Sequence, residues 1–415
     1  MDESNKEAEA LRAEMLDRLR RIQGHLAEDV AGAMSVVPRH VFVPQVSLER
    51  AYGAGPVVTH RDEQGVAISS ASAAGTVAGM LEQAQVRPGH RVLEIGSGTG
   101  YNAALLAHLV GPSGAVTTIE YDTRVADAAR HALSAYGAEH VNVITGDGTL
   151  GSVEDAPFDR ILVTAGAWDI PSAWRDQLAP GGRLVLPLRL RGLTRVAAFE
   201  RDGQALRSLS VAEDGFIPMQ GIGAVAEQNV SIGPGPDLTL RVDDGQPMDY
   251  AALAQALDRA PSIVWTGVSA PWAWTENLDF WLATLPGFCR IFVDQDAVAA
   301  GRVPRPKDSW GGSWGVFSGG SVAYLTARRT GGSDDMPMLE AGACGFGPDG
   351  TKLARALADR VTSWKREADG IEITIEAWPK GDLPADHEAG ALLVVDKAEN
   401  TFAVQISERT ASVKA

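Results

Sequence analysis

The sequence predicts an α/β fold built on a doubly wound, mainly parallel sheet, with an α+β region added at its C-terminal end. Three observations predict it. Short apolar runs alternate with helix-like stretches between about residues 90 and 190. A glycine-rich segment at 96–100 follows the first of these runs. The chain then changes character near residue 222, because glycine and proline accumulate in residues 221–236.

Composition narrows the functional classes. The 415 residues suggest two or three domains at roughly 150 residues each. A net charge of −16 argues against nucleic acid as a partner, and no apolar run approaches the ~20 residues of a membrane span. The charged N-terminus does not resemble a signal peptide. The chain has only two cysteines, which predicts no disulfide framework, and its eight histidines do not have the spacing of metal ligands. We therefore expect a cytoplasmic protein whose oligomeric state the sequence leaves open.

The predicted elements run in order along the chain. Apolar residues recur at spacings of three and four up to Leu26, which predicts helical structure before Pro38 and Pro44. Five apolar runs then read as strands buried on both faces, joined by crossover helices. The strands are expected at 91–95, 115–119, 141–144, 160–164 and 183–187, and the helices at 103–110, 123–136 and 172–178.

The composition change at 222 divides the chain into two predicted domains. Residues 1–222 would form the ligand-binding domain with its helical N-terminus, and residues 223–415 an accessory domain. Within the second, residues 353–364 have the spacing of an amphipathic helix, and residues 392–395 and 402–406 read as a terminal hairpin. Eight of the ten tryptophans lie beyond residue 222, which suits a surface that contacts peptides but equally suits a core.

The glycine-rich loop is the most informative segment. Its glycines have the spacing G-x-G-x-G at 96, 98 and 100, whereas a dinucleotide site has G-x-G-x-x-G. The acidic Glu94 just before the loop would repel a pyrophosphate but attract a cationic sulfonium or an amino group. The loop therefore favours S-adenosylmethionine over NAD, although a purely structural turn is the alternative.

Two further acidic residues follow predicted strands. Glu120 ends the second strand, where an acidic side chain contacts ribose hydroxyls in such folds. Asp147 follows the third strand, where it is a candidate to bind the adenine amine. Each has a simpler interpretation: a solvated charge at a strand end for Glu120, and an Asp-Gly turn for Asp147.

These residues belong to segments that resemble a known family. GHRVLEIGSGTGYNAALLA, TTIEYD, NVITGDGTLG, APFDRILVTAGAWDIPSAW and QLAPGGRLVLPL look like protein-L-isoaspartate O-methyltransferases, as do the flanking VPRHVFVP and GFIPMQG. The resemblance spans roughly residues 30–221 and implies a class I, Rossmann-like methyltransferase fold. It also implies S-adenosylmethionine as cofactor and S-adenosylhomocysteine as product. The implied cofactor contacts are Glu94, Gly96, Ser97, Gly98, Tyr101, Glu120, Tyr121, Asp147 and Gly148.

The resemblance also places a substrate-side serine ahead of the loop. The family carries Ser-x-Pro there; its serine aligns with Ser72, or with Ser70 at an offset of two, and Ala74 replaces the proline. We take Ser72 and Ser70 as candidate catalytic residues, with a helix N-cap serine as the alternative. The candidate substrate contacts are Ser69, His60, Trp168 and Arg189. The alternative for His60 is a solvated histidine, and the alternative for Trp168 is a packed side chain. The alternative for Arg189 is a solvated hairpin that also includes Arg191 and Arg195.

A narrower resemblance concerns the substrate. The SSAS start, the GAWDIP loop, PLRLRGLTR and stretches of the C-terminal region look like methyltransferases of gene clusters for ribosomally made peptides. This implies a precursor peptide, macrocyclised as a lanthipeptide, lasso peptide or graspetide. Its Asp carboxylate would be esterified and would close to an aspartimide, or to isoaspartate after hydrolysis.

The sequence therefore predicts an S-adenosylmethionine-dependent carboxyl O-methyltransferase. The precursor peptide is the first expectation for its substrate, and the C-terminal domain would then recognise that peptide. The alternative is an isoaspartyl repair enzyme with an appendage. A third possibility is a non-catalytic scaffold that keeps the cofactor pocket, and only the altered Ser-x-Pro segment favours it.

Overall fold

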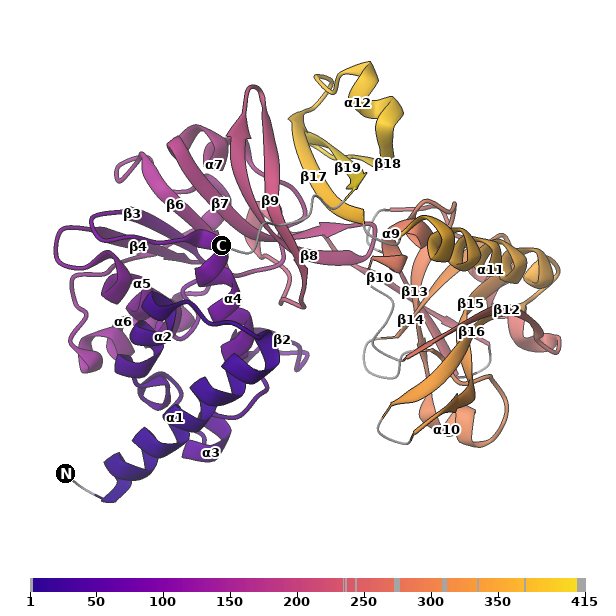
Figure 1. The fold of residues 1–415 in the computed structure, drawn as a ribbon, viewed down its shortest axis with the longest axis horizontal. Coiled ribbons are helices and arrows are strands. Elements are labelled where there is room, and N and C mark those ends of the chain that lie inside the picture. Colours follow the sequence, from indigo (N-terminus) through magenta and orange to yellow (C-terminus); the bar gives the residue numbers. More distant parts are fainter. Residues whose placement is uncertain are drawn as a thin grey trace.

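The computed structural model describes residues 3–233, 235, 237–242, 245–271, 277–307, 312–333, 336–368 and 371–408. A large sheet flanked by helices fills one side of the molecule, and a second sheet carrying a long helix lies beside it (Figure 1). Within the described residues, no helix combines the length and the apolarity that crossing a membrane requires.

The N-terminal segment forms two main helices. α1 (Glu3–Gln23) and α2 (Glu28–Val36) are separated at Gly24, whose φ of +70° is incompatible with a right-handed helix. The short η1 (Arg39–Phe42) and α3 (Leu48–Ala51) follow. A hairpin of β1 (Val57–Arg61) and β2 (Ala67–Ala71) then leads into α4 (Ala74–Ala84).

The predicted doubly wound sheet is confirmed. Its parallel strands are ordered β7-β6-β3-β4-β5, so the chain starts in the middle at β3, winds outward to β5, and returns to the other side of β3 with β6. The strands are β3 (Arg91–Ile95), β4 (Ala115–Glu120), β5 (Asn142–Thr145), β6 (Phe158–Val163) and β7 (Leu178–Leu190). The predicted crossover helices are α5 (Tyr101–Val110), α6 (Thr123–Tyr136) and α7 (Ser172–Gln177), and the turn η2 (Gly148–Leu150) follows β5.

The large sheet continues beyond the predicted first domain. β8 (Leu193–Asp202) and β9 (Ala205–Glu213) add antiparallel strands, and β17 (Ile371–Pro379) pairs with β9 through Ala377 and Leu206. β19 (Asn400–Glu408) and β18 (Ala391–Asp396), joined to β17 through α12 (Ala385–Gly390), complete ten strands. The predicted terminal hairpin is therefore present. However, it belongs to the large sheet, so a single boundary at 222 does not describe the chain.

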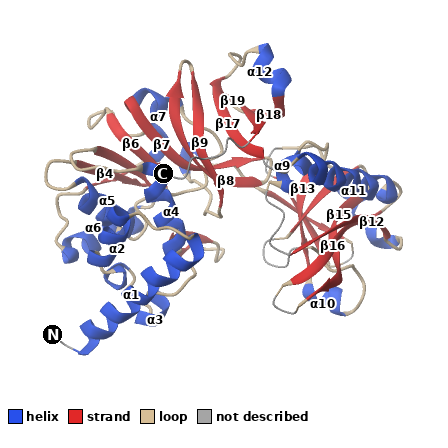
Figure 2. Ribbon diagram, in the orientation of Figure 1, coloured by secondary structure: helices blue, strands red, loops and turns tan. Residues whose placement is uncertain are grey.

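The second sheet has seven antiparallel strands in the order β10-β11-β13-β14-β15-β16-β12. The predicted amphipathic helix is α11 (Gly350–Glu367), which packs against β12, β15 and β16 through residues such as Leu357, Val361 and Trp364 (Figure 2). The strands are β10 (Gln228–Ile232), β11 (Leu238–Val242), β12 (Ser262–Pro271), β13 (Phe288–Val293), β14 (Ser313–Ser318), β15 (Ser321–Gly332) and β16 (Pro337–Phe346). The remaining helices are η3 (Gly221–Gly223), α8 (Tyr250–Ala254), η4 (Ala256–Asp258), α9 (Leu278–Ala283) and α10 (Gln295–Ala299).

The three arginines of the β7–β8 hairpin hold the second sheet and its helices against the large sheet. Arg195 forms a buried ion pair with Asp279 of α9, and Arg191 donates to the carbonyls of Ala283 and Leu285. Arg189 pairs with Glu227 at 3.0 Å. Their partners are acidic side chains and carbonyls of distant segments, so they do not form the solvated hairpin of the alternative interpretation.

We expect the Arg195–Asp279 pair to be important for stability. Asp279→Asn leaves the buried guanidinium without its counter-charge, which should lower the free energy of unfolding by about 3–5 kcal/mol. Asp17→Asn, which breaks the exposed Arg20–Asp17 pair, is the matched control and should cost under about 1 kcal/mol. Guanidinium denaturation followed by tryptophan fluorescence measures both. Equal losses in the two variants would contradict a stabilising role for the buried pair.

Candidate functional site

A cavity lies at the carboxyl ends of the parallel strands, where the strand order reverses between β3 and β6. Its volume is about 520 Å³, within the ~300–1,000 Å³ typical of small-molecule sites. It is lined by the β3–α5 loop, the end of β4, the segment after β6, the β2–α4 junction and residues 214–220. The cavity thus joins the predicted cofactor loop to the predicted substrate segment.

The loop glycines are required by backbone conformation and by space. Gly96 and Gly98 have φ of +98° and +52°, values that other residues adopt rarely. A Cβ on Gly96 would approach the Thr164 hydroxyl to 2.7 Å, and one on Gly148 would approach the Ile95 side chain to 2.4 Å. Gly96, Gly98 and Gly148 also line the cavity, so the tight packing of glycine backbone against Thr164 and Ile95 fixes this part of its wall.

Glu94 lies at the end of β3, fully buried. Its carboxyl accepts hydrogen bonds from the Thr118 hydroxyl of β4 at 2.6 Å and from the Asn102 amide of α5 at 2.8 Å. Burial raises the pKa of this carboxyl to about 7. Ser97 is also buried and shares a hydrogen bond of 2.8 Å with Thr118. Both residues line the cavity, but their polar atoms already bind neighbouring elements.

Glu120 points from the end of β4 toward the same loop. Its Oε2 accepts from the Gly98 amide at 3.0 Å and its Oε1 from the Asp122 amide at 3.3 Å. Burial raises the pKa of this carboxyl. Tyr121 beside it is 51% exposed and lines the cavity, and Tyr101 lines it from the start of α5. The Glu120 carboxylate keeps acceptor capacity toward the cavity, as the predicted ribose contact requires.

Asp147 does not line this cavity, although the neighbouring Gly148 does. Its Oδ1 accepts from the Thr149 amide at 2.9 Å, and its Oδ2 from the Ile222 amide at 2.7 Å. It thereby fixes the segment that leads out of the catalytic region against the turn after β5. This geometry matches the turn interpretation of Asp147 and adds a tertiary contact that the sequence does not indicate.

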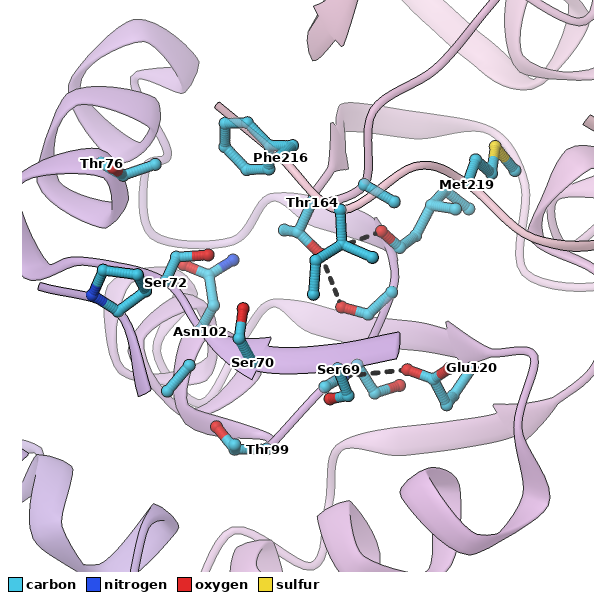
Figure 3. Close-up of a pocket in the computed structure, with 18 of the residues that line it drawn as sticks. Ser69, Ser70, Ser72, Thr76, Thr99, Asn102, Glu120, Thr164, Phe216 and Met219 are labelled. Carbon is cyan, nitrogen blue, oxygen red and sulfur yellow. Dashed lines mark hydrogen bonds between the residues drawn. The ribbon is translucent and has the colours of Figure 1, made fainter. Parts of the chain in front are cut away.

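The substrate end of the cavity carries the candidate serines. Figure 3 shows Ser72, Thr76 and Phe216 at one end and Glu120 at the other, with Ser70 between them. The hydroxyls of Ser70 and Ser72 form no hydrogen bond with any described residue, whereas Ser69 accepts from Thr59 at 3.1 Å. α4 begins at Ala74 with Ala73 as its N-cap and no side-chain cap, so Ser72 is not the capping serine of the alternative interpretation.

Arg39 is a residue that our sequence reasoning did not single out. It is 1% exposed, and its Nη2 donates to the Ser72 carbonyl at 2.7 Å, while its Nε donates to the Ala51 carbonyl at 2.8 Å. It therefore fixes the backbone of the serine segment. The signal that could have identified it is an arginine inside the otherwise apolar VPRHVFVP segment, where an unpaired charge would be costly.

Three predicted substrate residues lie outside the cavity lining. His60 is on β1, with Nδ1 3.3 Å from the Thr59 hydroxyl. Arg189 is ion-paired with Glu227. Trp168 packs under Lys397, whose Nζ lies 4.1 Å from the ring centroid and donates to the carbonyls of Trp168 and Arg189. For Trp168 the packing alternative describes the structure, since the C-terminal hairpin covers its ring.

The cavity fits S-adenosylmethionine in its donor set. Glu120 offers a carboxylate for ribose hydroxyls, and the Gly96–Gly98 backbone lines the cavity beside it. Glu94 provides a buried carboxyl on the wall that a positively charged ligand would face. Within the described part of the chain, no three His, Cys, Asp or Glu side chains converge as metal ligands would.

Comparisons with known proteins agree with this geometry. Residues 10–222 match the profile of the Protein-L-isoaspartate(D-aspartate) O-methyltransferase (PCMT) family. A protein-L-isoaspartate O-methyltransferase of Methanopyrus kandleri is 40% identical over 224 residues, which cover 53% of this chain and 96% of that protein. One of Hyperthermus butylicus is 41% identical over 221 residues, 51% of this chain and 88% of that protein.

Two solved structures with that description are more distantly similar. A protein-L-isoaspartate O-methyltransferase gives a TM-score of 0.49 at 20% identity and covers 96% of this chain and all of that one. A putative one from Plasmodium falciparum, in complex with S-adenosyl-L-homocysteine, gives 0.44 at 21% identity over 50% of this chain and 97% of that one. The family profile ends at residue 222, so residues 223–415 lie outside that match.

The pKa of Glu94 generates a pH prediction. The folded chain holds this proton more tightly than the unfolded chain, because burial raises the pKa from 4.5 to about 7. The stabilising contribution is therefore complete below pH 4.5 and is lost as the pH rises through about 7. Between pH 6 and 8 the wild type should lose about 1 kcal/mol more stability than Glu94→Gln, which cannot ionise and whose amide oxygen can still accept one of the two hydrogen bonds. Denaturant titrations across this range measure the difference, and parallel pH profiles would contradict it.

Proposed function

The chain belongs to the protein-L-isoaspartate O-methyltransferase family and is an S-adenosylmethionine-dependent protein carboxyl O-methyltransferase, and we propose that it methylates the free carboxylate of an isoaspartyl residue in a protein or peptide. The relatives that match over nearly their whole length carry that name. The observation that carries the proposal is a single cavity with Glu120 at one end and, at the other, the hydroxyls of Ser70 and Ser72, which form no hydrogen bond with any described residue.

The chemistry suits these residues. A carboxylate is already ionised at pH 7, since its free pKa is near 4, so the site needs no strong general base. It must instead hold one carboxylate oxygen and leave the other free to attack. The hydroxyls of Ser72 and Ser70 can donate to the held oxygen, next to the N-terminal turn of α4, whose dipole favours an anion.

The cavity wall supports this role by excluding water. Phe216 and the buried Met219 line it from the segment after β9, and Arg39 fixes the Ser72 backbone from behind. Dehydrating and orienting the carboxylate raises its reactivity. S-adenosylmethionine supplies an electrophilic methyl group on a sulfonium and leaves as neutral S-adenosylhomocysteine.

The ester explains how isoaspartate can be repaired. The nitrogen of the following residue attacks the ester carbonyl, its proton passes to solvent, and methanol leaves, which forms a succinimide. Water then opens the succinimide at either carbonyl and gives aspartate or isoaspartate. Both steps proceed without further help from the protein.

A second candidate is supported by the chain beyond the family match. The second sheet, with α11 packed on it, lies entirely beyond residue 222, and Ala74 replaces the family proline beside Ser72. An added domain and an altered serine segment suit a dedicated peptide substrate. In this proposal the chain esterifies a normal Asp of a ribosomally made, macrocyclised precursor peptide and so installs an aspartimide.

A matched pair of synthetic peptides separates the two candidates. We expect transfer of a labelled methyl group to an isoaspartyl peptide with kcat/KM at least about 100-fold above that of its normal-Asp twin. The precursor-peptide candidate predicts instead that neither peptide reacts well. A neighbouring-gene precursor would then gain one methyl group and show net loss of one water by mass spectrometry. Absence of turnover on all three would contradict both and favour a non-catalytic scaffold.

The serines provide a second test. Ser72→Ala should lower kcat/KM for the preferred peptide about 10- to 100-fold, the loss expected for one hydrogen bond to a charged group. Binding of S-adenosylhomocysteine, measured by calorimetry, should stay unchanged because Ser72 lies away from Glu120. Ser35→Ala, at an exposed serine of α2, is the control. If only Ser70→Ala reduces turnover, Ser70 rather than Ser72 holds the carboxylate. If neither variant reduces turnover, the carboxylate does not bind at this end of the cavity.

A further inference from the structure

A second cavity adjoins the substrate end of the first. Its volume is about 610 Å³, and it runs between α1 and α4 on one side and β8 and β9 on the other. Thr76, Met80 and Asp214 line both cavities. The Thr76 hydroxyl donates to Asp214 at 2.5 Å and thereby marks the rim between them. We call this second cavity the α4 groove.

The α4 groove is open because α4 carries glycines on this face. Gly75 and Gly79, one helical turn apart, both line it. A Cβ on Gly79 would meet only the Gln23 amide, at 4.0 Å, and one on Gly75 would meet Leu19 at 3.7 Å. Neither glycine is needed for a positive φ or a close backbone contact. Glycine lowers helix stability relative to alanine by about 1 kcal/mol, so folding alone does not account for them.

The charge of the groove is negative. Glu82, Glu213 and Asp214 line it, against Arg183 as the one cation among the described lining residues. Arg183 is already paired with Glu200 at 2.6 Å and donates to the Gln83 carbonyl. Glu213 is exposed and forms no ion pair with any described residue. A cationic side chain would therefore be attracted to this surface, and an acidic one repelled.

The remaining lining suits the stem and head of a long basic side chain. Leu209, which is 49% exposed, and the buried Met80 offer apolar surface. Gln83 uses its amide nitrogen toward Val196 and Ser210, which leaves its amide oxygen as an acceptor facing no described donor. Lysine and arginine pack their aliphatic stems on apolar surface while the charged head finds acceptors.

We propose that the α4 groove binds the segment of the substrate peptide that flanks the methylated residue, and that it selects a lysine or arginine there. The proposal rests on the proposed function, because it takes a peptide carboxylate at Ser72 as its starting point. The peptide leaves the first cavity across the Thr76–Asp214 rim. The groove thus adds a specificity site to the reaction centre.

The first test fills the groove. Gly79→Leu places a side chain in it without touching the first cavity, and Gly32→Leu on α2, where a Cβ meets nothing within 4 Å, is the matched control. The substrates are a blocked isoaspartyl tripeptide and a nine-residue isoaspartyl peptide with lysines on both sides. We expect the long-to-short ratio of kcat/KM to fall at least tenfold in Gly79→Leu and to stay at the wild-type value in Gly32→Leu.

The second test reverses the charge of Glu213 in the groove. It gives an independent result if Gly79→Leu does not fold. We compare kcat/KM for the lysine-flanked peptide with kcat/KM for a twin peptide flanked by glutamates. Glu213→Arg should lower the lysine-to-glutamate ratio of these two values at least tenfold. Circular dichroism and S-adenosylhomocysteine binding verify that each variant is folded. Unchanged ratios in folded Gly79→Leu and Glu213→Arg would overturn the groove proposal while leaving the proposed function intact. A wild type that methylates neither the short nor the long isoaspartyl peptide would overturn the proposed function itself.

Discussion

The buried carboxyl of Glu94 joins three elements that line the cavity. It extends from the central strand β3 and binds Thr118 on β4 and Asn102 on α5. Since the glycine loop connects β3 to α5, the hydrogen bond from Asn102 joins the two elements that flank the loop, and the bond from Thr118 joins β3 to β4. A buried carboxyl without partners would cost several kcal/mol, so strand, helix and loop must assemble together. Glu120 then binds the same loop through the Gly98 amide, and the shape of the cavity follows from these two carboxyls.

The C-terminal part of the chain completes the catalytic sheet. After the second sheet and α11, the chain returns through β17 to β9, and the β18–β19 turn docks on the loop after β6. Lys397 donates to the Trp168 carbonyl, and Asn400 donates to Asp169 at 2.7 Å. That loop pairs in turn with the cavity wall, because the Met219 amide donates to the Gly166 carbonyl at 3.0 Å and the Gly166 amide donates to the Ile217 carbonyl at 2.8 Å. The second sheet is thus an insertion between two strands of the large sheet, and the residues after it support the wall of the site.

The sequence was most informative where structure is local. The alternation of apolar runs and helices predicted β3 to β7, and the spacing around Gly96 predicted the position of the cavity, because both depend on neighbouring residues. The pairing of β17 with β9 could not be predicted, since Ala377 and Leu206 are far apart in sequence and nothing in either strand specifies the other. The contacts of Arg189 with Glu227 and of Asp147 with the Ile222 amide could not be predicted for the same reason, since these partners are far apart in sequence.

The central claim is that one cavity holds both reactants, with the nucleoside at Glu120 and the acceptor carboxylate at the serines. A crystal structure of the full chain with S-adenosylhomocysteine and an isoaspartyl peptide tests it most directly. We expect the ribose hydroxyls within hydrogen-bond distance of the Glu120 carboxylate and the isoaspartyl carboxylate within the same distance of Ser72 or Ser70. A nucleoside bound away from Glu120, or a carboxylate bound outside the cavity, would contradict the claim.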